Sequence, residues 1–332
     1  MSQRSALNAQ RSSRQNKKTI LLTGCAGFIG SNLLDKLLSE RHTVIGVDDF
    51  NDYYSPSQKR ANIAQHLNNK NFKLIETDIN NLTIEQFNNE TIDAIIHLAA
   101  RAGVRASIQQ PLLYEKVNVG GTLKMLELTK DLKAKHFIFG SSSSVYGNDT
   151  SVPFKENAPC DQPISPYAAT KRAAELLCCT YHKLYKIPVT ILRFFTVYGP
   201  RNRPDMAAFK FMDSIAKGKP IETYGVGTSR DYTFVNDIVN GIMASLNLSK
   251  PKFNIINLGN SSPVLLREFI AAIESTVGKK AILRSKPLPP SDVNATYADI
   301  TGAITLLRWK PKINLETGLQ QLWEWYALQN FK

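Results

Sequence analysis

One short stretch near the start of the chain constrains the fold more than any other. The apolar run Ile-Leu-Leu-Thr at 20–23 leads into three glycines spaced three residues apart, and an amphipathic helical pattern over 29–38 follows. A buried strand that turns through glycines into a helix brings backbone amides and the positive end of the helix to one point. This order predicts a parallel α/β sheet with a phosphate-binding loop made of Gly24, Gly27, Phe28, Ile29 and Gly30.

The same alternation of short apolar strands and amphipathic helices continues through the first two hundred residues. We predict further buried strands at 43–48, 72–76, 94–98, 137–140 and 189–194, with helices at 114–132 and 167–184. Strands that are apolar on both faces belong to a parallel, doubly wound sheet with helices on each side, which is a Rossmann domain. Ligands of such a sheet bind at the carboxyl ends of its strands.

The pattern changes after Pro200, where prolines interrupt mixed segments. We expect the Rossmann domain to cover 18–199 and to regain 231–261, including a strand at 253–258. A smaller mixed α/β domain for the substrate is expected from 200–230 and 262–332, closed by a helix at 315–328. Residues 1–17 are rich in Arg and Ser, contain no acidic residue and lack the apolar core of a secretory signal, so we predict a disordered basic tail.

Charge and cysteine content narrow the class of protein. The 332 residues carry a formal net charge of +13. Outside the tail the basic residues are scattered and do not alternate with aromatic ones, which favours steering of an anionic small substrate over nucleic-acid binding. No apolar run is long enough to span a membrane. The four cysteines, Cys25, Cys160, Cys178 and Cys179, lack zinc-site spacing and fit reduced thiols of a cytoplasmic protein without a metal.

Acidic residues at strand ends identify the dinucleotide. Asp48 ends the second strand, 18 residues after Gly30. A carboxylate there accepts hydrogen bonds from ribose hydroxyls and repels a 2′-phosphate, so we expect NAD rather than NADP. The alternative is that Asp48 only caps a turn, and Asp78 after the third strand is either an adenine contact or a solvated loop residue. The loops around these strands supply the remaining expected cofactor contacts: Asn51, Ile79, Leu98, Ala99, Ala100 and Asn118.

A tyrosine and a lysine one helical turn apart carry the candidate chemistry. Tyr167 and Lys171 stand at positions i and i+4 and therefore share a helix face. An ammonium near the phenol is expected to lower the tyrosine pKa and make it a general base. The alternative is an ordinary exposed pair. The serine cluster at 141–144 follows a predicted strand and reaches the same sheet edge, which weakens that alternative.

From 19 to 326 the chain resembles the extended short-chain dehydrogenase/reductase family, also called the NAD-dependent epimerase/dehydratase family. The Ser/Thr–Tyr–Lys triad of that family falls on Ser142, Tyr167 and Lys171. Within the family the chain is most similar to UDP-glucuronate 4-epimerases. The matching segments are FNDYY at 50–54, AGVR at 102–105, RFFTVYGP at 193–200, RPDMA at 203–207, GNSSPV at 259–264 and TYAD at 296–299.

The resemblance implies conversion of UDP-glucuronate to UDP-galacturonate through a 4-keto sugar. Tyr167 would take the C4 hydroxyl proton while NAD accepts the C4 hydride, and NAD, which stays bound, would return the hydride to the other face. Related dehydratases carry Asp-Glu after the catalytic Ser/Thr and decarboxylases a Glu nearby, whereas Ser143 and Ser144 stand here. The resemblance also implies a homodimer through the helices at 114–132 and 167–184, with Leu123, Leu126, Leu176 and Leu177 as candidate contacts or as ordinary core residues.

The resemblance also assigns the substrate contacts. Thr196 and Arg203 match positions near the sugar carboxylate, with Ser143 and Ser144 assisting. A bidentate pair between Arg203 and this carboxylate is expected, and a surface arginine beside Pro204 is the alternative. Arg230 is expected on the diphosphate, Tyr224 at the uracil and Asp292 at its ribose, and Arg105 completes the set. His97 is expected to be a buried strand-end histidine, and Met206 and Met212 to be packing residues.

Two departures from the family pattern concern the identity of the sugar. Ser291 stands where a glycine is usual, and Arg201-Asn202 replaces the usual pair after Pro200. A 4-epimerase of UDP-N-acetylglucosamine or UDP-glucose is therefore the second hypothesis. A non-catalytic NAD-binding or nucleic-acid-binding protein of the same fold is the third. The complete triad argues against the third, because such a protein has no need of it.

Overall fold

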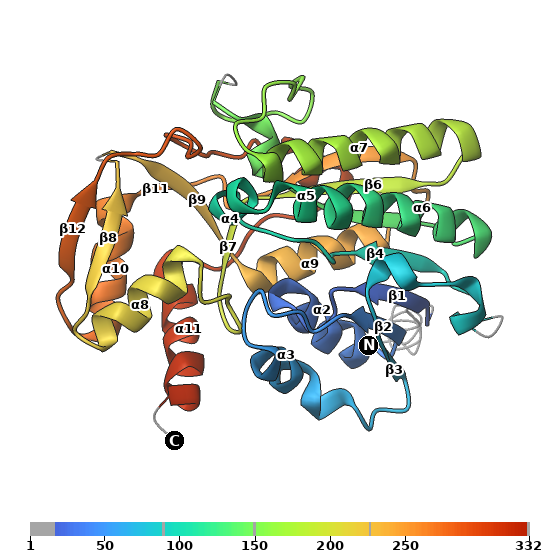
Figure 1. Ribbon diagram of the computed structural model, residues 1–332, viewed down its shortest axis with the longest axis horizontal. Coiled ribbons are helices and arrows are strands. Elements are labelled where there is room, and N and C mark those ends of the chain that lie inside the picture. Colours follow the sequence, from blue (N-terminus) through green and yellow to red (C-terminus); the bar gives the residue numbers. More distant parts are fainter. Residues whose placement is uncertain (1–16, 88–89, 149–150, 226, 331–332) are drawn as a thin grey trace, which may run out of the picture.

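The large sheet has seven parallel strands in the order β3-β2-β1-β4-β5-β6-β10 (Figure 1). We describe it from a computed structural model, which covers residues 17–87, 90–148, 151–225 and 227–330. The strands are β1 (Thr19–Thr23), β2 (Thr43–Asp48), β3 (Phe72–Glu76), β4 (Ala94–His97), β5 (Phe137–Ser142), β6 (Val189–Phe194) and β10 (Phe253–Leu258). The order confirms the predicted doubly wound Rossmann fold. Apart from Lys17, the expected tail at 1–17 lies outside the described residues.

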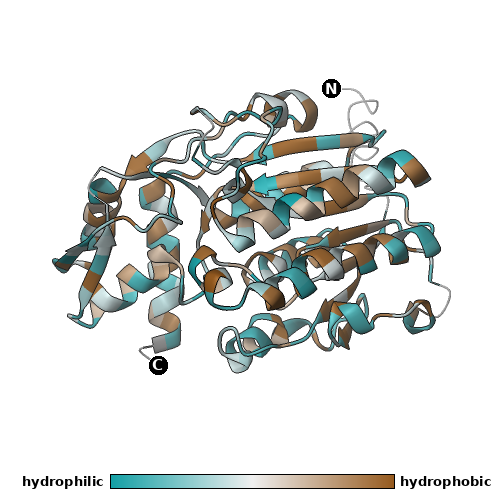
Figure 2. Cartoon of the chain, turned by 45° about the horizontal axis from the view of Figure 1, so that its top comes forward, coloured by the Kyte–Doolittle hydropathy of each residue, from teal (hydrophilic) through white to brown (hydrophobic). Residues whose placement is uncertain are grey.

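Helices cover both faces of this sheet. Residues Ile20 and Leu22 of β1 belong to the core that includes α2 (Phe28–Ser39) and α9 (Val235–Leu246). Leu21, which points the other way, belongs to the core that includes α6 (Gly121–Asp131) and α7 (Pro166–Tyr185). In Figure 2 the strands of the sheet are mainly hydrophobic, whereas the helices beside them carry both kinds of residue. The strands are thus buried on both faces, as their continuous apolar runs require.

The helix predicted at 114–132 is interrupted. It consists of α5 (Pro111–Tyr114), a π-helical turn at Glu115–Gly120 and α6. The side-chain amide of Asn118 in this turn donates to the Arg101 carbonyl (2.9 Å) and accepts from the Arg101 amide (2.8 Å). A Cβ on Gly121 would lie 2.5 Å from Ile79 Cδ1, so glycine at this position permits the close approach of α6 to Ile79. Tertiary contacts of these residues, which periodicity does not reveal, account for the break.

The remaining elements surround or extend the sheet. They are the helices α3 (Pro56–Ile63), α4 (Val104–Gln109), α8 (Ala207–Ala216), α10 (Leu266–Val277) and α11 (Leu315–Asn330), and the strands β7 (Thr196–Tyr198), β8 (Pro220–Tyr224), β9 (Ser229–Phe234), β11 (Pro263–Leu265) and β12 (Ile282–Lys286). Short 3-10 turns lie at Ala64–His66, Ile79–Asn81, Ile84–Phe87 and Ser143–Tyr146, and a π-turn at Ala303–Leu307.

The elements after β6 build smaller sheets beside the large one. β9 pairs with β7 and β11, and β8 pairs with β12, while α8, α10 and α11 pack on one another. Figure 1 shows β8, β12, α8, α10 and α11 together at the left, away from the large sheet. β10 alone returns to the large sheet, beside β6. The division into two domains at the expected boundaries stays a prediction. In the described part of the chain, no helix has the length and hydropathy needed to cross a bilayer.

Candidate active site

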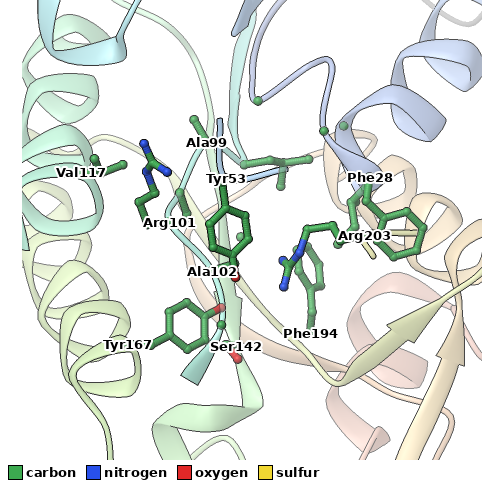
Figure 3. Close-up of a pocket in the computed structure, with 18 of the residues that line it drawn as sticks. Phe28, Tyr53, Ala99, Arg101, Ala102, Val117, Ser142, Tyr167, Phe194 and Arg203 are labelled. Carbon is green, nitrogen blue, oxygen red and sulfur yellow. The ribbon is translucent and has the colours of Figure 1, made fainter. Parts of the chain in front are cut away.

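A cavity of about 390 Å³ opens at the carboxyl ends of the strands of the large sheet. Figure 3 shows that side chains from β5, α7 and the loops after β2 and β7 point into it. Most residues singled out from the sequence line this cavity. They are Gly24, Gly27, Phe28, Ile29, Gly30, Asp48, Asn51, Asp78, Ile79, Leu98, Ala99, Ala100, Ser142, Ser143, Ser144, Tyr167, Lys171, Thr196 and Arg203.

The glycine loop between β1 and α2 forms one wall. Gly24 has φ +70°, and a Cβ on it would lie 2.8 Å from the Ala99 amide nitrogen. A Cβ on Gly30 would lie 1.9 Å from the Gly24 carbonyl oxygen. Gly27 precedes the first residue of α2 in an extended conformation. Side chains are thus excluded from a loop that leads to a helix N-terminus, which fits the diphosphate of a dinucleotide.

Asp48 both holds this loop and lines the cavity. Its two carboxylate oxygens accept from the Ala26 and Phe50 amides, each at 3.0 Å. Burial raises the pKa of Asp48, while these amide hydrogen bonds and the charge of Lys59 act in the opposite direction. Asp78 similarly accepts from the Asn80 amide (2.8 Å) and also reaches the cavity. The capping interpretation and the cofactor interpretation therefore apply to the same side chains.

Asn118 lies behind the cavity wall rather than in it. Besides Arg101, its amide contacts the Thr170 hydroxyl at 3.1 Å, so each of its side-chain polar atoms has a protein partner. The side chain is fully buried. In this structure the π-helical turn directs Asn118 at the strand-end loop that lines the cavity, so the side chain supports that loop. Its expected direct contact with the cofactor stays a prediction.

The catalytic candidates meet at the start of α7. Ser165 caps this helix by accepting from the Ala168 amide (3.2 Å) and Pro166 occupies its first turn, so Tyr167 is held at the helix N-terminus. The Tyr167 hydroxyl points at Ser142 (Figure 3). Burial raises the pKa of Tyr167, opposed by the Ser142 hydrogen bond and by the charge of Arg203.

Lys171 differs from expectation. Its Nζ donates to the Gly140 carbonyl at 2.7 Å and lies 4.8 Å from the centre of the Phe139 ring. Burial lowers the pKa of Lys171 to about 8. The expected lowering of the Tyr167 pKa by Lys171 is wrong for this structure. The ammonium donates to the Gly140 carbonyl at the end of β5, and burial of the phenol raises the Tyr167 pKa.

The serine cluster divides into two groups. Ser142 donates to the Ser144 hydroxyl (3.1 Å) and accepts from the Ser144 amide (3.2 Å) beside Tyr167. Ser141 instead donates to Glu175 at 2.6 Å. Glu175 forms a fully buried ion pair with Arg193 (2.8 Å). The sequence analysis did not identify this pair, although Arg193 stands in the RFFTVYGP segment and Glu175 follows Lys171 by one helical turn.

Arg203 lines the cavity but is already paired. Its Nε and Nη2 donate to the two carboxylate oxygens of Asp205, at 2.9 and 2.8 Å. Asp205 thus occupies the Nε–Nη2 edge of the guanidinium, and the expected bidentate pair with a substrate carboxylate stays a prediction. Met206, which was expected to be a packing residue, lines the cavity and lies 3.5 Å from Arg203 Nη2. Met212 is fully buried, as expected.

The four remaining substrate candidates lie outside the cavity lining. Arg105 forms an ion pair with Asp292 (2.9 Å), and its guanidinium lies 3.9 Å from the centre of the Tyr224 ring. The fold therefore brings together three predicted residues from distant parts of the sequence. Arg230 is directed at backbone, donating to the Ser229 carbonyl at 2.8 Å and the Asn294 carbonyl at 3.3 Å.

Several lining residues were not predicted as contacts. Tyr53, Tyr54, Lys59, Thr77 and Arg101 are among them. The first two lie in the FNDYY segment, which was the available signal. His97 is buried between the Thr23 and Thr122 hydroxyls, and burial lowers its pKa to about 3. It is thus a neutral core histidine, as expected.

Metal and thiol chemistry have no evident centre in the part of the chain that the structure describes. Among those residues no three His, Cys, Asp or Glu side chains are grouped to hold a metal ion. All four cysteines are free, and all except Cys179 are buried.

Comparison with known proteins shows the family to which the chain is related and relatives with named activities. The GDP-mannose 4,6-dehydratase family profile matches residues 21–322. The chain is similar to UDP-glucuronate 4-epimerase of Thermodesulfobacterium geofontis, with 44% identity over 92% of this chain and 95% of the relative. Both relations extend over nearly the whole described chain.

Solved structures agree with this relation. UDP-glucuronic acid 4-epimerase from Bacillus cereus, in complex with UDP-glucuronic acid and NAD, superposes with a TM-score of 0.88 at 36% identity and covers 94% of this chain and 99% of its own. UDP-glucose 4-epimerase from Thermotoga maritima with UDP-glucose superposes with a TM-score of 0.85 at 30% identity, over 94% and 99%.

Proposed function

We propose that this chain, which belongs to the GDP-mannose 4,6-dehydratase family, is an NAD-dependent UDP-glucuronate 4-epimerase. It interconverts UDP-glucuronate and UDP-galacturonate. The observation that carries the proposal is the Ser142–Tyr167 pair in the cavity. The two residues that follow Ser142 in the sequence, Ser143 and Ser144, also line this cavity. The acidic pair that a dehydratase carries after its catalytic Ser/Thr is replaced by these hydroxyls, so the site has no group placed there for elimination.

The residues on the glycine loop fit NAD. Gly24 and Gly30 leave no room for side chains, and α2 directs its N-terminus to the same point. Asp48 and Asn51 hold the ribose, while Asp78 and Ile79 face the adenine. When bound, NAD supplies the acceptor and the donor of the C4 hydride. Because the hydride returns to the same sugar, we expect the purified protein to retain NAD.

Tyr167 moves the proton in this reaction. Its hydroxyl and that of Ser142 converge, so both contact the O4 atom of a bound sugar. Tyr167 acts in its ionised form: the phenolate takes the proton from O4 as the ketone forms and returns it after the sugar ring has turned. Ser142, whose hydroxyl donates to Ser144 in this structure, turns this hydrogen to O4 and positions the sugar. Lys171 donates to the Gly140 carbonyl and so holds the end of β5, the strand that carries Ser142.

The substrate carboxylate faces Thr196, Ser143, Ser144 and Nη1 of Arg203, the guanidinium nitrogen that Asp205 does not contact. A 4-keto glucuronate is a β-keto acid and loses carbon dioxide when the bond to its carboxylate stands perpendicular to the carbonyl plane. Hydroxyl donors and one cation around the carboxylate hold it away from that alignment. Arg105, Tyr224, Arg230 and Asp292 are assigned to the UDP moiety, and the Arg105–Asp292 pair opens when UDP enters.

A second activity, 4-epimerisation of UDP-glucose or UDP-N-acetylglucosamine, is favoured by one observation. We call the part of the cavity at Ser143, Ser144, Thr196 and Arg203 the carboxylate corner. Asp205 neutralises Arg203, so this corner offers less positive charge than an unpaired arginine would. A neutral hexose tolerates such a corner. The Thermotoga maritima relative carries UDP-glucose on the same fold.

We also propose a homodimer in which α6 and α7 of two copies form a four-helix bundle. Leu123 and Leu176 are exposed on these helices and suit that contact. Leu126 is fully buried in the protomer and suits the core, whereas Leu177 is partly buried against the same core and remains a candidate contact. The free thiols suit a cytoplasmic protein. A monomeric mass in light scattering at micromolar concentration would reject the dimer.

The proposed activity is tested with a panel of UDP-sugars. Each sugar is incubated with the purified protein and the products are resolved by NMR, while the denatured supernatant is assayed for NAD and NADP. We expect UDP-galacturonate from UDP-glucuronate and bound NAD. If UDP-glucose or UDP-N-acetylglucosamine is the better substrate, the second activity replaces the first.

A further inference from the structure

Two residues in contact with Arg203 have no assigned role. Tyr53 lines the cavity, whereas Asp205 lies just outside the lining and contacts both Arg203 and Tyr53. Tyr53 lies on the loop after β2, whereas Asp205 and Arg203 lie between β7 and α8. The Tyr53 hydroxyl donates to Asp205 Oδ2 at 3.2 Å, and the Arg203 guanidinium lies 5.5 Å from the centre of the Tyr53 ring. Figure 3 shows Tyr53 and Arg203 side by side above Tyr167 and Ser142.

The contacts of Arg203 leave it a single free group. A guanidinium has five N–H donors. Nε and one Nη2 hydrogen are used by Asp205, and Met206 Sδ lies 3.5 Å from Nη2. The donors that remain for a ligand are therefore the two hydrogens on Nη1. A carboxylate bound there is held at one nitrogen only, and its orientation depends on how Asp205 turns the guanidinium.

The charges of this corner are fixed in place. Burial opposes the charge on Arg203, but the hydrogen bonds and charge of Asp205 outweigh it and raise the Arg203 pKa. Burial also opposes ionisation of Asp205, and the hydrogen bonds of Arg203 nevertheless keep its pKa below the usual range. Burial raises the pKa of Tyr53, which stays a neutral donor. An ion pair and a phenol thus coexist beside the reacting hydroxyls at neutral pH.

We infer that Asp205 and Tyr53 are positioning residues, which hold Arg203 so that only Nη1 meets the substrate carboxylate and which thereby limit decarboxylation of the keto intermediate. The inference rests on the proposed function and adds the specificity of the same site. Asp205 also repels the substrate carboxylate, so it lowers affinity for the acid sugar while it fixes the geometry.

The side reaction that this arrangement limits balances without further reagents. In the 4-keto sugar the C5–C6 bond breaks, carbon dioxide leaves, and the electron pair forms the enolate of the C4 ketone. A proton taken up at C5 gives the UDP-4-ketopentose. A carboxylate held close to the carbonyl plane does not reach this step, because the breaking bond then overlaps poorly with the carbonyl.

The test uses the NAD-loaded enzyme and two near-isosteric variants, Asp205→Asn and Tyr53→Phe. Asp52→Asn is the matched control, since it makes the same charge change on the loop of Tyr53 at an exposed residue outside the cavity lining. For each protein, carbon dioxide and UDP-pentoses are measured per UDP-galacturonate formed, together with KM for UDP-glucuronate and the Kd of UDP-glucose.

Asp205→Asn is expected to lower KM for UDP-glucuronate by about three- to fivefold, the scale of a partly exposed ion pair, and to raise the decarboxylated fraction by a similar factor. Tyr53→Phe should shift the decarboxylated fraction in the same direction by less, because its ring remains under Arg203. The Kd of UDP-glucose should not change, and Asp52→Asn should match the wild type.

Weaker binding of both sugars with an unchanged carbon dioxide fraction would show that Asp205 is only structural and would overturn the inference. Should Asp205→Asn fail to fold, Tyr53→Phe decides the outcome alone through its carbon dioxide fraction. Failure of the proposed function is seen separately, because the wild type would then form no UDP-galacturonate from UDP-glucuronate.

Discussion

The two halves of the active site differ in how their residues are held. In the cofactor half, backbone amides and small residues of consecutive strand-end loops define the shape, and Asp48 joins two of these loops through amide hydrogen bonds. In the part proposed to bind UDP, which we call the UDP half, side chains from distant segments meet each other, as Arg105 does with Asp292 and Tyr224. The first half is therefore held by backbone hydrogen bonds and steric exclusion, whereas the second is held by side-chain contacts that a ligand can replace.

Tyr167 stands at the boundary between the halves, and its removal gives the largest expected effect. Tyr167→Phe keeps the ring against Tyr114 and removes the acid/base group. Turnover should fall by about 10²–10⁴-fold, the usual scale of general acid–base catalysis, while NAD and UDP-sugar remain bound. Steady-state kinetics and titration calorimetry measure the two effects. A variant with near wild-type turnover would remove Tyr167 from the mechanism.

Lys171, which is buried beside the cofactor half, makes the stability of the protein depend on pH. Its pKa is about 8 in the folded protein and lies near the ordinary 10.5 when unfolded. Between these values the unfolded chain binds more protons, so the free energy of unfolding should rise with pH by about 3 kcal/mol in total. Lys171→Met should lack this rise. Denaturant unfolding from pH 7.5 to 10 measures the difference, and parallel curves for the two proteins would contradict it.

The glycine loop tests whether the cofactor half is rigid. In Gly30→Ala the new Cβ meets the Gly24 carbonyl at 1.9 Å, and backbone on both sides must move. We expect a loss of about 1–3 kcal/mol in the free energy of unfolding and a protein purified without NAD. Gly27→Ala is the matched control, because its Cβ would lie 3.3 Å from the same oxygen. Equal NAD content in the two variants would show that this loop adapts.

The Arg105–Asp292 pair gives the smallest effect. Arg105 is about half exposed in this ion pair. A double-mutant cycle with Arg105→Met and Asp292→Asn should give a coupling of about 0.2–1 kcal/mol in stability. Saturating UDP should abolish this coupling, because each side chain then contacts the nucleotide instead. A coupling that is unchanged by UDP would mean that the pair is a permanent part of the fold.

The same contrast explains what the sequence could predict. The strands of the large sheet and the loop at Gly24–Gly30 depend on residues close together in the chain, and all were predicted within two residues of their bounds. The interruption at Asn118 was missed because its partners, Arg101 and Thr170, are distant in sequence. Even Asp205, two residues from Arg203, was overlooked, since only the turn between them brings its carboxylate onto the guanidinium.

Arg105, Tyr224 and Asp292 were assigned to the substrate only through resemblance to the family, and their contact with one another was not predicted. Nothing in their local sequence indicates that they share a surface, and each also suits a solvated loop. Their contact depends on how the segments after β6 pack against α4. The pKa of Tyr167 was predicted in the wrong direction for a similar reason, because the burial of a side chain follows from the whole fold.

In the proposed reaction one site oxidises and then reduces C4 of the same UDP-glucuronate molecule. The most direct test supplies UDP-glucuronate with deuterium at C4 and follows the products by NMR. We predict UDP-galacturonate that retains the deuterium at C4, since the transferred hydride does not exchange with water. Product that has lost the deuterium, or an absence of UDP-galacturonate while the label stays in unreacted substrate, would contradict the account.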